Sequence, residues 1–154
     1  MAIKEGAPAP DVELETESGE KLRLSSLRGR KVILYFYPKA DTPGCTREAC
    51  EFRDNFPNFE GQDAIVIGVS PDTPAAQSKF KTKYELPFTL LADVNHKAAE
   101  AFGVWVEKSM YGRKYMGVER STFLIDEDGK IAKVFAKVKP AGHAEQVLEA
   151  LKAL

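Results

Sequence analysis

The sequence has few cysteines and no excess of charge of one sign. Its 154 residues include 2 cysteines, and 22 lysine and arginine residues stand against 23 acidic residues, giving a formal net charge of -1. A small secreted domain held together by disulfides would need more cysteines. The charge balance supplies no basic field for a nucleic acid backbone or an anionic membrane surface. We therefore expect neither nucleic acids nor membranes among the partners.

Long apolar runs are also missing. The longest, from Val32 to Tyr37, is far shorter than the roughly 20 residues that a membrane span requires. Residues 1–8 contain no apolar stretch of the kind found in signal peptides. With 44% hydrophobic and 29% charged residues, the chain has enough apolar side chains to bury a core. Its length predicts one domain over residues 1–154, and we expect that domain to be cytoplasmic.

Two segments rich in β-branched and aromatic residues predict central strands. Residues 31–37 and 62–69 are largely apolar, which is typical of strands buried on both faces of a sheet. Between them, residues 45–55 are polar and charge-rich, with the composition of a helix. The order strand, helix, strand predicts a βαβ unit with a right-handed crossover.

The rest of the sequence predicts further helices and an antiparallel hairpin. Helices are expected at residues 74–84, 97–102 and 144–154, a short strand at 88–91, and hairpin strands at 121–125 and 131–135. In the last helix, one face carries Val147, Leu148, Leu151 and Leu154. Parallel strands followed by an antiparallel hairpin predict a thioredoxin-like α/β fold, with a mixed central β-sheet sandwiched between helices.

The most informative segment is residues 38–50, PKADTPGCTREAC. Thr42 is a favoured N-cap residue and Pro43 suits the first helical position, so Cys45 falls in the first turn of a helix. Free backbone N–H groups and the positive end of the helix dipole favour a thiolate there. The segment also follows the carboxyl end of a central strand, where open α/β sheets carry their sites. We expect a functional thiol at Cys45; the alternative is an ordinary capped helix with an incidental cysteine.

A helix terminus alone is too weak to make such a thiol reactive. A thiol with the reference pKa of about 8.5 is roughly 3% ionised at neutral pH, and a helix terminus contributes only about 0.3–1 kcal/mol. A neighbouring arginine could add roughly one to three pKa units. Because nucleophilicity falls as a thiol becomes more acidic, with a Brønsted slope of about 0.4–0.5, the net gain in rate is only a few-fold. Fast chemistry therefore requires hydrogen-bond donors aligned with the leaving group in the transition state.

The second cysteine, Cys50, lies five residues after Cys45. On a regular helix, residues five apart have Cα atoms about 8.7 Å apart and point roughly 140° away from each other. A disulfide requires Cα atoms within about 7 Å, so either the bond never forms or its formation partly unwinds the helix. The pair could also bind a metal, but His96 and His143 are both remote from it in sequence, and we expect no zinc site.

These residues resemble a peroxiredoxin, specifically the bacterioferritin comigratory protein or peroxiredoxin Q subfamily. The family pattern of Pro, three residues, Thr, two residues and Cys is met by Pro38, Thr42 and Cys45. The family's distant arginine, just ahead of an apolar strand, matches Arg120, and the subfamily's second cysteine matches Cys50. The resemblance covers almost the whole chain.

This resemblance implies a thiol-dependent peroxidase without a metal or flavin cofactor. Cys45 would attack the O–O bond of hydrogen peroxide or an organic hydroperoxide and become a sulfenic acid, releasing water or an alcohol. Thr42 and Arg120 would hold the peroxide, and Pro38 would shield the site from water. Cys50 would be the resolving cysteine, forming an intramolecular disulfide after local unfolding. Thioredoxin or a glutaredoxin-like donor would reduce that disulfide, and the subfamily suggests a monomer or weak homodimer.

The sequence also predicts the surroundings of three further polar residues. Glu48 is expected to be a solvated charge on its helix, and His143 a surface residue near the last helix. Asp41 would oppose ionisation of Cys45 unless its carboxylate points to solvent.

The alternative function belongs to a different class. A thioredoxin-fold redox sensor or a holdase-type chaperone would oxidise Cys45 once, without peroxidase turnover, and transmit the unwinding of the helix to a partner. A disulfide reductase of the thioredoxin type is less favoured, because its Cys-x-x-Cys spacing is absent.

Overall fold

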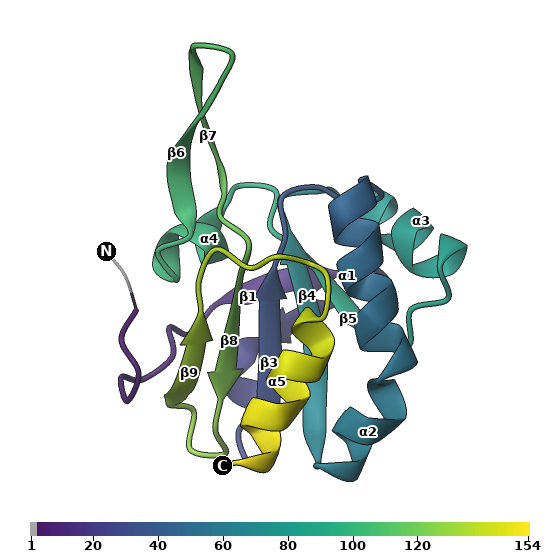
Figure 1. Ribbon diagram of the computed structural model, residues 1–154, viewed down its shortest axis with the longest axis vertical. Helices are drawn as coiled ribbons and strands as arrows, with labels where there is room; N and C mark the ends of the chain where they lie inside the picture. The colour runs from purple at the N-terminus through teal and green to yellow at the C-terminus, as the bar shows by residue number, and fades with distance from the viewer. Residues whose placement is uncertain (1–2) are drawn as a thin grey trace.

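A seven-stranded mixed sheet forms the centre of the computed structural model, which describes residues 3–154 (Figure 1). Its strands are β1 (Glu13–Thr16), β2 (Lys21–Arg23), β3 (Lys31–Phe36), β4 (Ala64–Ser70), β5 (Thr89–Ala92), β8 (Ser121–Ile125) and β9 (Ile131–Phe135). They lie in the order β2-β1-β5-β4-β3-β8-β9. β3, β4 and β5 are parallel, and the other pairings are antiparallel. The parallel pair β3 and β4 and the antiparallel hairpin β8–β9 agree with the sequence prediction.

Helices cover both faces of this sheet. They are the 3₁₀ helix η1 (Leu24–Leu27) and the α-helices α1 (Pro43–Asp54), α2 (Phe56–Gly61), α3 (Pro74–Lys83), α4 (Lys97–Ala101) and α5 (His143–Lys152). Side chains of α1, α2, α3 and α5 join one apolar cluster, and those of α4 and η1 join a second on the other face. α1 and α5 pack side by side (Figure 1). Within residues 3–154, no helix is long and apolar enough to cross a membrane.

β3 is the central strand, and its side chains enter both apolar clusters. Alternate residues of a strand point to opposite faces of the sheet. Those facing α1 are Ile33 and Tyr35, and those facing α4 are Val32, Leu34 and Phe36. β3 therefore confirms the prediction of a strand buried on both faces, and its carboxyl end leads into the loop before α1.

A separate hairpin stands apart from the central sheet. Its strands are β6 (Trp105–Met110) and β7 (Arg113–Val118), and they pair only with each other among the described residues. The hairpin rises from the end of the sheet at which β3 ends and α1 begins (Figure 1). It was not predicted from the sequence, because most of its side chains are exposed and no buried face imposes a regular alternation. β1, β2 and α2 were also not predicted.

The predicted apolar face of the last helix needs one correction. α5 ends at Lys152, two residues before the predicted end. Val147, Leu148 and Leu151 are buried on that face, whereas Leu154 lies beyond the helix and is 55% exposed. A residue past the helix end no longer follows its 3.6-residue period, so the buried face ends at Leu151.

Candidate active site

Cys45 lies in the first turn of α1, at the carboxyl end of β3. Pro43 is the first helical residue, and the backbone N–H of Thr46 donates to the Thr42 carbonyl at 2.8 Å, which closes the turn. The first N–H groups of a helix have no partner within it, and they carry the positive end of its dipole. Cys45 is only 1% exposed. The predicted position of this thiol is therefore correct, and it is largely shielded from water.

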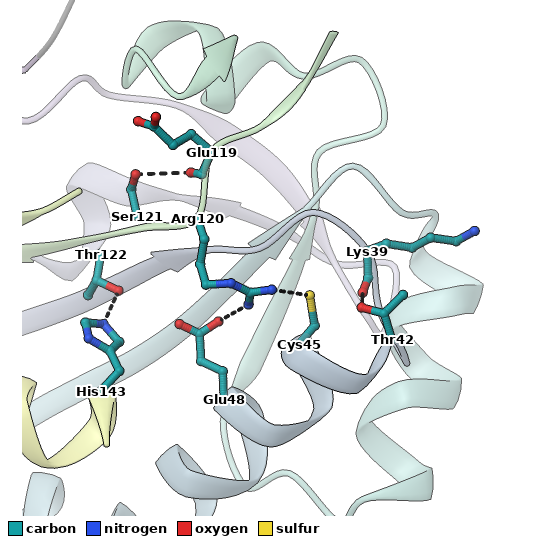
Figure 2. A network of polar contacts seen from close by, with 9 residues as sticks. All are labelled: Lys39, Thr42, Cys45, Glu48, Glu119, Arg120, Ser121, Thr122 and His143. Atoms are coloured by element: carbon teal, nitrogen blue, oxygen red, sulfur yellow. Dashed lines mark hydrogen bonds and ion pairs between the residues drawn. The ribbon is translucent and has the colours of Figure 1, made fainter. Parts of the chain in front are cut away.

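Arg120 brings its guanidinium to the sulfur from the residue before β8. Its Nη2 donates to Cys45 Sγ at 3.3 Å (Figure 2). The two residues lie 75 positions apart in the sequence. They meet because β8 pairs with β3, with Ser121 opposite Phe36. Gly44 leaves room for this approach, since a Cβ there would lie 3.2 Å from Arg120 Nη2.

Glu48 holds the other side of the same guanidinium. Arg120 Nη1 donates to Glu48 Oε1 at 2.7 Å (Figure 2). The expectation of a solvated charge is wrong, because Glu48 is 1% exposed. It lies three residues after Cys45, on the same helix face, and that face packs against the sheet. Burial raises the pKa of Glu48 to about 7, despite the opposing charge of Arg120. Glu48 and Cys45 thus fix the guanidinium between them.

Thr42 occupies the N-cap position of α1, but its hydroxyl does not cap the helix. Thr42 Oγ1 instead donates to the Lys39 carbonyl at 2.8 Å (Figure 2). With its proton engaged in this way, the hydroxyl oxygen still has lone pairs that can accept a hydrogen bond. The backbone N–H of Ala40 donates to Asp72 Oδ2 at 2.7 Å, which fixes the same loop to the segment just after β4. Pro38 also lies in this loop and is half-buried.

This chain is similar to proteins of one family in its sequence and in its structure. The model of the AhpC/TSA family matches residues 6–134. Peroxiredoxin Bcp of Bacillus subtilis is 52% identical over 152 residues, which cover 99% of this chain and 97% of that protein. This chain is a peroxiredoxin, a thiol peroxidase of the AhpC/TSA family. Peroxiredoxin Bcp of Escherichia coli is 46% identical over 150 residues, covering 97% of this chain and 96% of its relative.

Solved structures place this peroxiredoxin in the peroxiredoxin Q subfamily. Xylella fastidiosa PrxQ superposes with a TM-score of 0.94 at 36% identity, covering 99% of this chain and 98% of that one. The bacterioferritin comigratory protein of Xanthomonas campestris gives a TM-score of 0.92 at 38% identity, covering 97% and 98% of the two chains. The predicted thioredoxin-like fold and the predicted subfamily are both confirmed.

The second cysteine of this peroxiredoxin, Cys50, lies in the same helix. Both cysteines are free, and Cys50 is half-buried. Because α1 is continuous from Pro43 to Asp54, the two thiols cannot join until part of the helix unwinds. The next residue, Glu51, ties this part of α1 to the start of α5, since its Oε1 accepts a hydrogen bond from the Gly142 N–H at 2.9 Å.

Asp41 directs its charge towards α3. Its carboxylate accepts hydrogen bonds from Tyr84 Oη at 2.6 Å and Lys83 Nζ at 2.9 Å. These two contacts, that of Tyr84 first, lower the pKa of Asp41. The backbone adopts a φ of 61°, in the left-handed region, to turn the loop in this direction. The carboxylate is therefore paired with a cation and a hydroxyl rather than with the thiol.

His143 is buried, so its predicted surface position is wrong. It is 2% exposed at the start of α5, and its Nε2 lies 2.8 Å from Thr122 Oγ1 (Figure 2). Phe52 and Phe135 pack edge-on against its ring. Burial lowers the pKa of His143, which favours the neutral imidazole. The residue joins α5 to β8, and no sequence signal distinguished it from an exposed histidine.

Glu48→Gln is expected to remove a pH-dependent part of the stability. A carboxyl group whose pKa rises on folding from 4.5 to about 7 binds more protons in the folded chain than in the unfolded chain. The stability that this carboxyl group contributes is fully present below about pH 4.5, where it is protonated in both states. That stability is lost as the pH rises through about 7, so the free energy of unfolding falls over this interval. The fall attributable to Glu48 is on the order of 3 kcal/mol. Glutamine can still accept from Arg120 but does not titrate.

Urea unfolding between pH 4.5 and 7.5 measures this difference. The matched control is Glu145→Gln, which removes an exposed carboxylate from α5. The wild-type chain and the control should lose stability equally over the interval, and Glu48→Gln should lose less. Equal losses in all three proteins would contradict the assignment of this titration to Glu48.

Proposed function

We propose that Cys45 is the peroxidatic thiol of this chain and that it reduces hydrogen peroxide and organic hydroperoxides. The observation that carries the proposal is the 3.3 Å contact between Arg120 Nη2 and Cys45 Sγ. A guanidinium beside the sulfur favours the thiolate and offers several donors in a fixed plane. The Xanthomonas campestris relative is described by its alkyl peroxide reduction activity, which supports organic hydroperoxides as substrates here.

In the first step, the Cys45 thiolate attacks one oxygen of the peroxide and the O–O bond breaks. Sulfur loses two electrons and becomes a sulfenic acid, while the leaving oxygen takes a proton and departs as water or an alcohol. Negative charge moves from sulfur to the leaving oxygen, so a donor that spans both positions stabilises the transition state. Arg120 is placed to do this, and Thr42 Oγ1 offers an acceptor for the peroxide proton. Pro38 limits access of water.

In the second step, the Cys50 thiolate attacks the sulfenic sulfur. The S–S bond forms as the S–O bond breaks, the leaving oxygen takes a proton and departs as water, and both cysteines end in a disulfide. This step requires the part of α1 between the two thiols to unwind, which breaks the contact between Glu48 and Arg120. A dithiol reductant of the thioredoxin or glutaredoxin type then restores both thiols. We also propose that the chain acts as a monomer or weak homodimer.

Thioredoxin-coupled peroxide consumption tests the proposal against the sensor or chaperone alternative. The wild-type chain should consume many equivalents of peroxide per chain while reductant is supplied. A single stoichiometric oxidation of Cys45, with no further consumption, would instead favour a redox sensor. Parallel assays with hydrogen peroxide and an organic hydroperoxide rank the two substrates.

Cys50→Ser is expected to complete one oxidation and then stall. Without the resolving thiol, Cys45 stays as sulfenic acid or is oxidised further to sulfinic acid by excess peroxide. Mass spectrometry of the intact chain should find one or two added oxygen atoms, peroxide consumption should stop after about one or two equivalents, and no sustained thioredoxin-linked turnover should follow. Sustained thioredoxin-linked turnover by this variant would show that Cys50 is not the resolving cysteine. It would not contradict the proposed attack of Cys45 on the peroxide.

A further inference from the structure

Glu51 uses both oxygens of its carboxylate to hold α1 where the two thiols must approach each other. Its Oε2 accepts a hydrogen bond from Arg47 Nε at 3.1 Å, one turn earlier on α1. Its Oε1 accepts from the Gly142 N–H at 2.9 Å, at the N-cap position of α5. The positive end of the α5 dipole strengthens the second contact. The carboxylate therefore joins two turns of α1 to each other and joins α1 to α5.

The segment of α1 that Glu51 holds is the segment between the two cysteines. Cys50 directly precedes Glu51, and Arg47 lies between Cys45 and Cys50. The ion pair between Arg47 and Glu51 requires an intact helix, because residues four apart share a face only there. Cys50 points roughly 140° away from Cys45 about the helix axis, so it must turn before a disulfide can form. That turn moves the backbone next to Glu51, and the bond to Gly142 opposes it.

The loop that provides Gly142 also lies against the first turn of α1. A Cβ on Gly44 would lie 3.5 Å from Pro140 Cγ, which places this proline beside the residue that precedes Cys45. The loop between β9 and α5 therefore contacts α1 near both thiols. Its contact with Glu51 is a single hydrogen bond, so one substitution can remove it.

The ease with which α1 unwinds decides what happens to the oxidised enzyme. Once Cys45 is a sulfenic acid, the Cys50 thiolate can attack its sulfur; the S–S bond forms, the S–O bond breaks and the oxygen leaves as water. A second peroxide molecule can instead oxidise the same sulfur to sulfinic acid, as its own O–O bond breaks and water or an alcohol leaves. Only the first reaction requires unwinding. Contacts made only in the intact helix therefore favour the second reaction.

We propose that Glu51 is a positioning residue that restrains the unwinding of α1 and so sets the balance between disulfide and sulfinic acid. Its two contacts stabilise the helix in which Cys45 meets peroxide. Their loss lowers the barrier to unwinding, which speeds disulfide formation and protects Cys45 from further oxidation. Glu51 acts through the helix rather than by touching the reacting atoms. The inference rests on the proposed roles of Cys45 and Cys50.

Glu51→Ala tests the proposal in a single turnover. After rapid mixing with a stoichiometric amount of peroxide, quenching and mass spectrometry of the intact chain follow the sulfenic acid and the disulfide. The disulfide should form about tenfold faster than in the wild-type chain, because a hydrogen bond to a charged group and an ion pair are both lost. The peroxide concentration at which half of the chains carry sulfinic acid should rise by a similar factor. The rate constant of the first oxidation should stay the same.

Two milder variants separate the contacts of Glu51. Glu51→Gln keeps an acceptor for the Gly142 N–H and loses the ion pair, whereas Arg47→Ala loses only the ion pair. Arg47 is 64% exposed, and an exposed pair of this kind contributes little. Both variants should therefore form the disulfide within about threefold of the wild-type rate. If Glu51→Gln is as fast as Glu51→Ala, the bond to Gly142 is not the restraint and the proposal is overturned.

Ile131→Val separates this restraint from a general loss of stability. Ile131 is buried in the apolar cluster on the other face of the sheet from α1, and the loss of one methyl group there destabilises the fold as a whole. Its rate of disulfide formation and its sulfinic fraction should match the wild type. Equal acceleration in Ile131→Val and Glu51→Ala, or no acceleration in Glu51→Ala, would overturn the proposal. A wild-type chain that forms no disulfide would overturn the role of Cys50 itself, which an unchanged rate in Glu51→Ala would leave intact.

Discussion

Cys45→Ser is expected to consume no peroxide above the uncatalysed rate. Serine places a hydroxyl where the thiol stood, and a hydroxyl neither ionises near neutral pH nor attacks an O–O bond as a soft sulfur nucleophile does. The buried site changes little in volume, and the new oxygen can accept the hydrogen bond that Arg120 now donates to sulfur. Thermal unfolding should therefore show a folded protein, while a coupled peroxide assay shows no turnover.

Cys50→Ser is the matched control for this result, because it removes the other thiol of α1 and spares the first oxidation. A reagent specific for sulfenic acids should label Cys50→Ser after one addition of peroxide and should not label Cys45→Ser. Labelling of Cys45→Ser, or peroxide consumption by it, would show that Cys50 carries out the first step. That result would contradict the roles proposed for the two cysteines.

Local sequence signals predicted the elements that position the thiol. β3 and β4 were recognisable because both of their faces are buried, so apolar residues run almost without interruption. The start of α1 was marked by Thr42 and Pro43, which fixed Cys45 in the first turn. Each of these features depends on a few neighbouring residues.

The partners of the thiol could not be predicted from local signals. Arg120 reaches Cys45 only through the pairing of β8 with β3, and strand register is a property of the whole sheet. The family resemblance pointed to Arg120, and the residues around it alone did not. Glu48 was missed because a charged residue on a helix is usually exposed. Its spacing from Cys45 and Phe52, which are both buried on α1, was the available signal.

Arg120→Lys is expected to lower the rate constant of peroxide attack by roughly a hundredfold to a thousandfold. A lysine carries the same charge but has one terminal nitrogen. It cannot reproduce the planar arrangement in which Nη2 contacts Cys45 Sγ while Nη1 contacts Glu48. The charge that favours the thiolate survives, whereas the donor geometry that stabilises the leaving oxygen is lost. Stopped-flow measurement of the first oxidation measures the rate constant, and thermal unfolding checks that the fold is retained.

Arg120→Met separates the two contributions of the arginine, because it removes the charge as well as the geometry. It also leaves the buried Glu48 without a partner, which costs about 3–5 kcal/mol of stability when the carboxyl is ionised. Because the pKa of Glu48 is already raised to about 7, this loss should be smaller at pH 6 than at pH 8. The double variant Arg120→Met with Glu48→Gln should recover stability at the higher pH and stay inactive. An Arg120→Lys rate within about threefold of the wild type would show that charge alone suffices, and the proposed role of the guanidinium at the O–O bond would be wrong.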